Sequence, residues 1–291
     1  LSMFTSYERN IGSHYLKGLV GYEEDVDKSK GLYGFKRNLI TDQVPSISTA
    51  TGDFTLDDAM DHWATQGVFG RINYNFDEKY LFEASARYDG SSRFAPGKRW
   101  GFFPSFSAGY NISKEHFCEP IKPYLNTFKL RGSYGALGNQ NVANYLYLPT
   151  IPIQYRRITD NSTNPGYIIG NEIPLYANAP RLLSPDLTWE KITTLNLGAE
   201  VSLLNSRLDL VFDWYNRITS DMLDPTAQLP ATLGASLPQS NNAKLSTKGY
   251  ELTLAWNDRI SEQVSYNLKA NFADNKTKIL EYYNQAGLVH N

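Results

Sequence analysis

The chain has 291 residues, and its 28 basic side chains nearly balance its 30 acidic ones, giving a formal net charge of -2. It lacks the basic excess of nucleic-acid-binding proteins, so no nucleic-acid partner is expected. The longest uninterrupted apolar run is four residues, Tyr145–Leu148, whereas a membrane helix needs about 20. Helical membrane spans are therefore excluded.

Alternation of apolar and polar residues predicts about nine β-strands. In chain order they are Tyr15–Glu23, which is the weakest, then Val68–Phe76, Tyr80–Tyr88, Phe102–Tyr110, Phe128–Ala136, Thr193–Leu203, Leu208–Trp214, Tyr250–Trp256 and Tyr266–Phe272. We therefore expect an all-β, antiparallel chain.

The connections between these strands alternate in length. The short set is Asn75–Lys79, Leu204–Ser206 and Asn257–Gln263, with Ile112–Leu125 as a longer member. The long set is Glu24–Gln66, Gly90–Arg99, Leu137–Thr188 and Asn216–Thr247. In outer-membrane barrels the periplasmic turns are short and the extracellular loops are long. The alternation therefore places Asn75–Lys79 in the periplasm and Leu137–Thr188 outside the cell.

The two faces of the eight clearer strands differ in kind. One phase is apolar and carries no charge, as Val68, Ile72 and Tyr74 illustrate. The charged residues fall on the other phase, at Arg71, Glu83, Arg87, Asp89, Lys129, Arg131, Glu200, Asp209, Asp213, Glu251 and Lys269. A mean hydropathy of -0.43 agrees with such strands, because half of a barrel strand faces a watery lumen.

Three features favour a membrane barrel over a soluble sandwich, which also has one apolar face. Several segments can extend to the roughly 9 to 11 residues that a tilted membrane strand needs. Aromatic residues gather near strand ends on the apolar phase, as in girdles at the headgroup level, at Tyr74, Phe76, Tyr80, Tyr88, Trp214 and Trp256. The connection lengths are the third feature. The alternative is a soluble β-rich glycan-binding module that uses loop aromatics.

No catalytic or metal-binding motif stands out. The histidines, His14, His62, His116 and His290, are far apart and lack metal-site spacing. There is no G-x-S-x-G elbow and no Ser, His and Asp set at strand ends. An outer-membrane enzyme is therefore the least favoured hypothesis, and no enzymatic activity is expected.

Two loops are weighed as ion sites. Oxygen-bearing residues loosely resemble a calcium loop at Asp160, Asn161, Ser162, Asn164 and Asn171. Pro165 and Asn171 stand where that loop needs Gly and Glu, so calcium has little support and no other cofactor is expected. The acidic residues Asp53, Asp57, Asp58 and Asp61 are interpreted as a solvated helical turn that begins near Thr55.

Loop aromatics and amides are the better candidates for ligand binding, because sugars and peptides are held by ring stacking and by hydrogen bonds. The long loop offers Tyr145, Tyr147, Tyr155, Arg156, Arg157, Tyr167 and Asn171 as candidate substrate-binding residues. Loop packing is the plainer interpretation of any one of them. No spacing selects among them.

Six blocks of sequence carry a further signal. The first two are RYDGSSRF at Arg87–Phe94 and RWGFFPSFSAGYNIS at Arg99–Ser113. The later four are KLRGSYGALGNQ from Lys129, LSPDLTWEKITTLNLGAE from Leu183, LDLVFDWYNRITSDML from Leu208 and TKGYELTLAW from Thr247. In this order the blocks resemble the barrel of SusC/RagA-type TonB-dependent transporters, and the resemblance runs from about Gly67 to the end of the chain. We expect Trp189, in the second of the later blocks, on the apolar phase at the membrane edge.

The resemblance implies import of oligosaccharides or peptides across the outer membrane of Bacteroidetes-type bacteria. TonB would power the import, and a SusD-like surface lipoprotein would cap the barrel. The parent would be a 22-stranded barrel with an amino-terminal plug. Residues 1–291 are therefore expected to be part of such a barrel, without its plug, its TonB box or its remaining strands, because about nine antiparallel strands cannot close.

Overall fold

The computed structural model describes residues 1–151, 153–155, 175–177, 180, 182–184, 186–225 and 238–282. Ten strands form one antiparallel sheet: β1 (Ser2–Ile11), β2 (His14–Lys36), β3 (Phe54–Phe76), β4 (Tyr80–Ser91), β5 (Trp100–Asn111), β6 (Leu125–Asn139), β9 (Glu190–Leu203), β10 (Leu208–Pro225), β11 (Gln239–Ser261) and β12 (Val264–Glu281). Two short strands, β7 (Ile153–Tyr155) and β8 (Leu175–Ala177), pair with each other. Three 3-10 helices complete the elements: η1 (Ile47–Thr49), η2 (Ile112–Lys114) and η3 (His116–Ile121).

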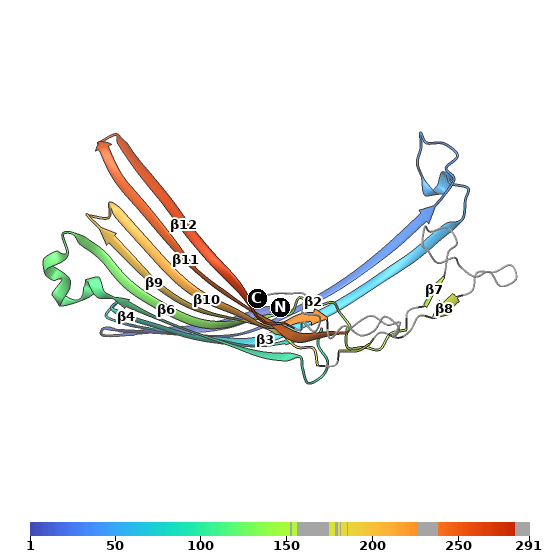
Figure 1. The fold of residues 1–291 in the computed structure, drawn as a ribbon, viewed down its shortest axis with the longest axis horizontal. Helices are drawn as coiled ribbons and strands as arrows, with labels where there is room; N and C mark the ends of the chain where they lie inside the picture. The colour runs from blue at the N-terminus through green and yellow to red at the C-terminus, as the bar shows by residue number, and fades with distance from the viewer. Residues whose placement is uncertain are drawn as a thin grey trace.

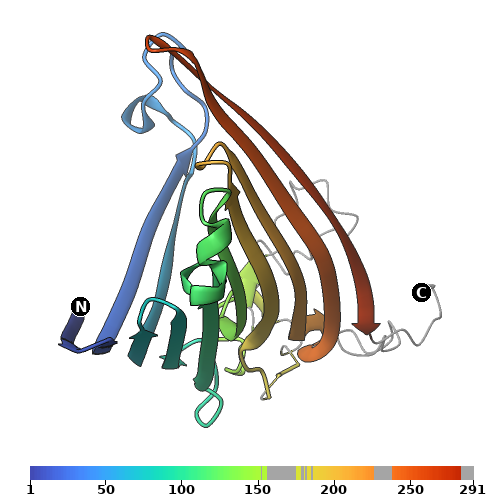
Figure 2. The ribbon, with the colours of Figure 1, turned by 90° about the vertical axis from the view of Figure 1, so that its left-hand side faces the viewer.

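The sheet is a simple meander, in which each strand pairs antiparallel with the next one along the chain. Strand β6 pairs with β9, because β7 and β8 lie in the insertion between them and form a separate two-stranded sheet. Figures 1 and 2 show one curved and twisted wall. Within the described residues its outer strands, β1 and β12, each pair on one side only. The expected all-β antiparallel class is confirmed.

The expected loop Glu24–Gln66 is largely wrong. Strand β2 runs on to Lys36 and β3 starts at Phe54, so the loop between them is only residues 37–53. The neighbours β1 and β4 stop pairing near Glu23 and Thr65. The two strands therefore project beyond the sheet as a two-stranded ribbon, which Figure 1 shows in blue. Backbone pairing is continuous along the whole β2–β3 hairpin, so the ribbon forms without the apolar and polar alternation that predicted the other strands.

The helical turn expected near Thr55 is also wrong. Asp57, Asp58 and Asp61 lie in β3, each opposite a residue of β2 in an unbroken register. The loop Asn216–Thr247 is shorter than expected too, because β10 ends at Pro225 and β11 begins at Gln239. Strand β1 was not predicted at all. It pairs with β2 through ten residues, from Ser2 opposite Glu23 to Ile11 opposite His14.

The apolar phase of the strands forms a continuous exposed surface. Directly opposed residues cross five strands in one row, at Leu130, Ala199, Phe212, Leu252 and Phe272. Of these, Leu130, Phe212 and Phe272 are 41%, 39% and 56% exposed. No second sheet covers this surface in the part of the chain that the structure describes. A soluble sandwich would bury it, so the soluble-module alternative is not supported.

Aromatic rings mark both ends of that surface. At the end with the short turns, the ring of Tyr80 stacks on that of Tyr110 with centroids 5.0 Å apart, and it lies 6.2 Å from the ring of Phe76. At the opposite end Tyr88 stacks on Trp100 at 4.8 Å. Amphipathic rings prefer the headgroup level of a membrane. The rings thus border an apolar band, as predicted.

Candidate functional site at the inner face and mouth of the wall

The inner face of the wall is polar and laced with ion pairs. Arg131 on β6 lies between two carboxylates, with Nε 3.0 Å from Glu200 on β9 and Nη2 2.7 Å from Asp213 on β10. Gly198 on β9 lies opposite both Arg131 and Asp213. A Cβ on this residue would come within 2.7 Å of Asp213 and 2.9 Å of Arg131. Glycine at this position leaves room for the three charged groups to meet.

A second group of polar side chains lies on the inner faces of β2, β3 and β4. Glu83 accepts a hydrogen bond from Nδ2 of Asn73 and lies 3.7 Å from Nε of Arg71. Arg87 forks onto both oxygens of Asp89 at 3.0 Å and reaches Glu23 at 3.2 Å. Such fork geometry fixes the guanidinium plane. The inner face therefore carries charged side chains that ion pairs and hydrogen bonds hold in place.

Buried apolar residues form a small core at the mouth, the end of the wall that carries the long loops. This mouth core consists of Phe94, Phe103, Val142, Leu187 and Trp189. The Trp189 ring lies 5.4 Å from each of the two phenylalanine rings, and its Nε1 donates to the carbonyl of Arg99 at 2.8 Å. The core joins the β4–β5 loop to both ends of the long β6–β9 insertion.

Trp189 is thus not a membrane-edge residue, contrary to expectation. Only 8% of it is exposed, and it packs on Phe103, whose chain neighbour Phe102 is on the exposed apolar phase. Trp189 precedes the first residue of β9, so the alternation of that strand does not extend to it.

The start of the long loop is fastened to the ribbon. Nδ2 of Asn144 lies 2.7 Å from both carboxylate oxygens of Asp61, and the Tyr145 hydroxyl donates to the carbonyl of His62 at 2.8 Å. Strand β4 does not pair with this part of β3, so the carbonyl is free to accept. Tyr145 adopts a φ of 63°, which is unusual for a residue with a side chain.

Arg93 links the same loop to the ribbon from the other side. Its guanidinium lies 4.9 Å from the ring centroid of Trp63, and its Nη1 donates to the carbonyl of Val142 at 2.8 Å. We call Asp61, Trp63, Arg93, Asn144 and Tyr145 the mouth cluster. Its aromatic faces, amide and cation are groups that suit sugars and peptides alike.

The structure places only some of the predicted ligand-binding residues. Tyr145 belongs to the mouth cluster, and Tyr147, in the same turn, is half-buried. Tyr155 lies in β7. The remaining candidates, Arg156, Arg157, Tyr167 and Asn171, and the suggested calcium ligands from Asp160 to Asn164 lie outside the described residues. Sequence patterns missed Asp61, Trp63, Arg93 and Asn144, which come together only in three dimensions.

The described residues contain no group of three or more His, Cys, Asp or Glu side chains arranged to hold a metal ion. Among them, no helix has the length and apolar character that a membrane span requires.

Comparison with known proteins identifies the wall. The family model described as TonB dependent receptor-like, beta-barrel matches residues 4–287. The chain belongs to this family. TonB-dependent receptor P3 of Formosa agariphila is 31% identical over 280 residues, which cover 96% of this chain and 27% of the relative. TonB-dependent receptor SusC of Bacteroides thetaiotaomicron is 30% identical over 237 residues, covering 75% of this chain and 22% of SusC.

Solved structures agree on the fold. The RagAB peptide importer in its closed-closed state matches with a TM-score of 0.83 at 23% identity, covering 97% of this chain and 30% of that one. The outer membrane transporter YddB from Escherichia coli matches with a TM-score of 0.61 at 12% identity, over 96% and 33% of the two chains. This TonB-dependent receptor chain thus spans about a quarter of the length of the curated relatives it matches.

The family accounts for the geometry. The receptor is an outer-membrane protein of the SusC and RagA type, so the exposed apolar phase faces lipid and the polar phase faces the lumen. The predicted location and family are confirmed. The short turns lie at the periplasmic end by the general rule for such barrels, and the mouth cluster lies at the extracellular end.

Proposed function

We propose that this chain forms part of the lumen wall and mouth of a TonB-dependent importer that takes up oligosaccharides or peptides together with a SusD-like surface lipoprotein. The single observation that carries the proposal is the polar inner face, held by ion pairs, opposite an exposed apolar lipid face. Arg131, Glu200 and Asp213 hold fixed positions on three adjacent strands, so the lumen side is preorganised rather than a loose polar surface.

The proposal includes the rest of the barrel. The wall would close with further strands and would enclose a plug domain through which TonB acts. The outer strands β1 and β12 would then pair with those further strands through their unpaired edges. Calcium is proposed to have no part in the inner-face or mouth chemistry, because both are built from internal ion pairs and hydrogen bonds.

The mouth cluster supports ligand contact at the extracellular end. Its Trp63 and Tyr145 rings are of the kind on which sugars or peptide side chains stack, and Arg93 and Asn144 carry donors. The similar RagAB structure is that of a peptide importer, which supports peptides as one of the two substrate classes.

The test is growth of the source bacterium without the parent gene. Cells are given an oligosaccharide mixture or a peptide mixture as the limiting nutrient, and uptake of labelled substrate is measured with and without a protonophore. We expect the deletion to abolish uptake of one class, and wild-type protein to restore it in a protonophore-sensitive manner. Unchanged growth on both classes, or uptake that ignores the protonophore, would refute the proposal.

A Trp63→Ala variant then tests the mouth. It should raise the substrate concentration needed for half-maximal uptake, while the barrel still assembles in the outer membrane. Phe106→Ala, on the lipid face, is the matched aromatic control and should leave that concentration unchanged. Equal effects of the two substitutions would mean that the mouth cluster has no special part in binding.

A further inference from the structure

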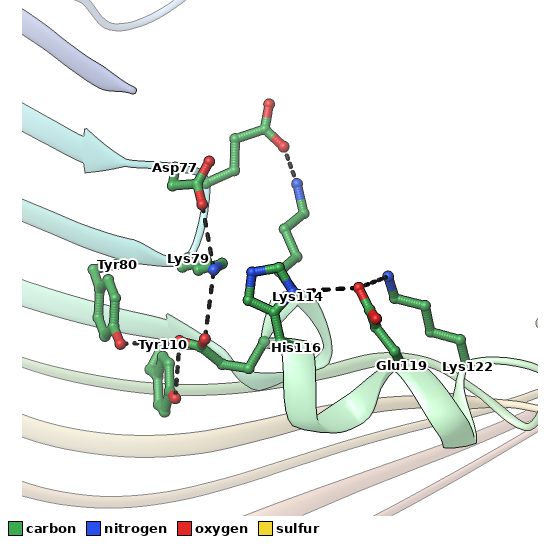
Figure 3. Close-up of polar contacts among 10 residues, drawn as sticks. Asp77, Lys79, Tyr80, Tyr110, Lys114, His116, Glu119 and Lys122 are labelled. Atoms are coloured by element: carbon green, nitrogen blue, oxygen red, sulfur yellow. Dashed lines mark hydrogen bonds and ion pairs between the residues drawn. The ribbon is translucent and has the colours of Figure 1, made fainter. Parts of the chain in front are cut away.

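The periplasmic connector, residues 112–124 between β5 and β6, has a regular three-residue pattern. Side chains three apart lie above one another in a 3-10 helix. His116, Glu119 and Lys122 form a polar stripe, with Glu119 lying 3.3 Å from His116 and 4.0 Å from Lys122 (Figure 3). Two further stripes are apolar: within η3, Phe117 and Pro120 begin one and Cys118 and Ile121 begin the other, and Pro123 and Tyr124 follow at the same spacing in the turn after Ile121.

The largest apolar side chains of the connector are exposed. Phe117 is 69% exposed, Ile121 45% and Tyr124 68%, whereas Cys118 is buried at 3%. Cys118 is thus on the covered side of the connector, whereas the described residues leave Phe117, Ile121 and Tyr124 uncovered. An apolar partner over these three side chains would make their exposure tolerable.

The start of the connector is fixed at the level of the periplasmic aromatic girdle. Glu115 accepts hydrogen bonds from the hydroxyls of Tyr80 at 2.9 Å and Tyr110 at 3.2 Å, and it lies 3.4 Å from Nζ of Lys79 (Figure 3). Tyr80 and Tyr110 are directly opposed on the lipid-facing phase, in line with Leu130. The connector therefore begins where the apolar band of the membrane ends.

Lys122, at the end of the polar stripe, identifies the side of the connector that faces the lumen. A hollow of about 1120 Å³ at the periplasmic end is lined by Lys114 and Lys122 of the connector. It is also lined by Tyr15, Asn75 and Thr127, which alternate with the lipid-facing residues of their strands. Lys122 thus turns toward the lumen side, and none of the three exposed apolar side chains lines the hollow.

We propose that Phe117, Ile121 and Tyr124 insert into the phospholipid interface of the periplasmic leaflet, so that the connector anchors the rim of the wall to the membrane. The occupant is lipid because the apolar stripes continue the lipid-facing girdle to which Glu115 is bound. Aromatic side chains are favoured at this depth. The proposal rests on membrane placement of the wall and not on what the receptor imports.

The test uses the full-length receptor in phospholipid nanodiscs, with Cys118 changed to Ser and single nitroxide labels at chosen cysteines. Labels at Phe117→Cys and Tyr124→Cys report on the apolar stripes, and Glu119→Cys on the polar stripe is the matched control. Phe106→Cys serves as the lipid reference and Glu262→Cys, in the β11–β12 turn, as the water reference. Collisions are measured with oxygen, which dissolves in lipid, and with a nickel chelate, which stays in water.

We expect labels at positions 117 and 124 to favour oxygen, as at position 106, and the label at 119 to favour nickel, as at 262. Two results would overturn the proposal. Nickel access at 117 equal to that at 262 would mean that water surrounds the ring. Shielding of 117 from both reagents would mean that protein, such as a plug, covers it.

A second measurement needs no change at Cys118. Phe117→Trp adds one fluorophore to the native tryptophans of the receptor, whose emission is subtracted using the unsubstituted receptor. Bromine on the phospholipid acyl chains should quench the added emission relative to unbrominated nanodiscs. An added emission that bromine leaves unchanged would contradict insertion, whether or not the cysteine variants fold.

Discussion

Nη2 of Arg131 on β6 lies 2.7 Å from Oδ2 of Asp213 on β10, although β9 runs between their two strands. The same guanidinium meets Glu200 on the intervening strand at 3.0 Å. The Asp213 side chain is only 18% exposed and that of Arg131 34%, so solvent screens this group less than an ordinary surface pair. One cation therefore ties three strands together on the lumen face.

Replacing Arg131 by Met should destabilise the barrel by about 1 to 3 kcal/mol, because Glu200 and Asp213 would face each other without a counterion. The measurement is the temperature at which the folded form loses its fast mobility in detergent gels. Lys129→Met is the control, since Lys129 is on the same strand and face and makes no ion pair with the described residues. An equal shift for the two variants would show that the ion pairs add nothing.

The faces of the wall could be predicted from the sequence, but the partners could not. Period-two alternation already put Arg131 and Asp213 on the polar phase. That they meet depends on the register of β6, β9 and β10, in which Arg131 and Asp213 both lie opposite Gly198. The mouth cluster was missed for the same reason, because Trp63 on β3, Arg93 in the β4–β5 loop and Asn144 in the β6–β9 insertion are far apart in sequence.

The ribbon shows where the pattern itself fails. Beyond the membrane both faces of β2 and β3 meet water, so selection for an apolar phase ends and polar residues such as Lys28 and Ser29 follow one another. Periodicity then gives no strand signal. Trp189 shows the opposite error, in which alternation was extended past the end of β9 into a chain segment that turns into the mouth core.

Adding a methyl group at Gly138 should disturb the mouth core. A Cβ there would overlap the buried ring of Phe103, whereas a Cβ on Gly18 meets nothing within 4 Å. We expect Gly138→Ala to cost about 1 to 3 kcal/mol through overpacking, and Gly18→Ala to be nearly neutral. Thermal unfolding of both variants in detergent is the measurement. Equal stability of the two would mean that Phe103 moves aside freely.

Removing the Tyr145 hydroxyl should loosen the long loop from the ribbon. Tyr145→Phe deletes one hydrogen bond to the carbonyl of His62, worth about 0.5 to 1.5 kcal/mol. Hydrogen exchange should then quicken in the ribbon around His62 and in the loop around Asn144. Tyr147→Phe is the control, because that hydroxyl makes no hydrogen bond to the described residues. The prediction is wrong if both variants exchange like wild type.

Acid should release the periplasmic connector through Glu115. Hydrogen bonds from Tyr80, opposed by partial burial and aided by the charge of Lys79, hold the pKa of the Glu115 carboxyl below its ordinary value of 4.5. A carboxyl with a lowered pKa in the folded state contributes stability above its unfolded pKa, and the contribution is lost as pH falls through the folded pKa. The connector should therefore stay fixed at neutral pH and loosen below pH 4.5.

Lys79 does not produce this transition. Burial lowers the pKa of its ammonium, but the hydrogen bonds and charges of Asp77 and Glu115 outweigh burial and raise it above 10.5. Its contribution is complete below pH 10.5 and is lost only as pH rises through the higher folded value. Acidification therefore reports on Glu115, and a mobility change confined to alkaline pH would assign the contact to Lys79 instead.

The mobility of a nitroxide at Glu119→Cys, recorded between neutral pH and pH 3, measures the release directly. In the Cys118→Ser background with Glu115 intact it should rise below pH 4.5, while a label at Glu262→Cys in the β11–β12 turn should not change. Glu115→Gln removes the titrating charge and its attraction to Lys79 but keeps an acceptor for the tyrosines. Its label should already be more mobile at neutral pH and should show no acid transition. A transition that survives in Glu115→Gln would show that another group holds the connector.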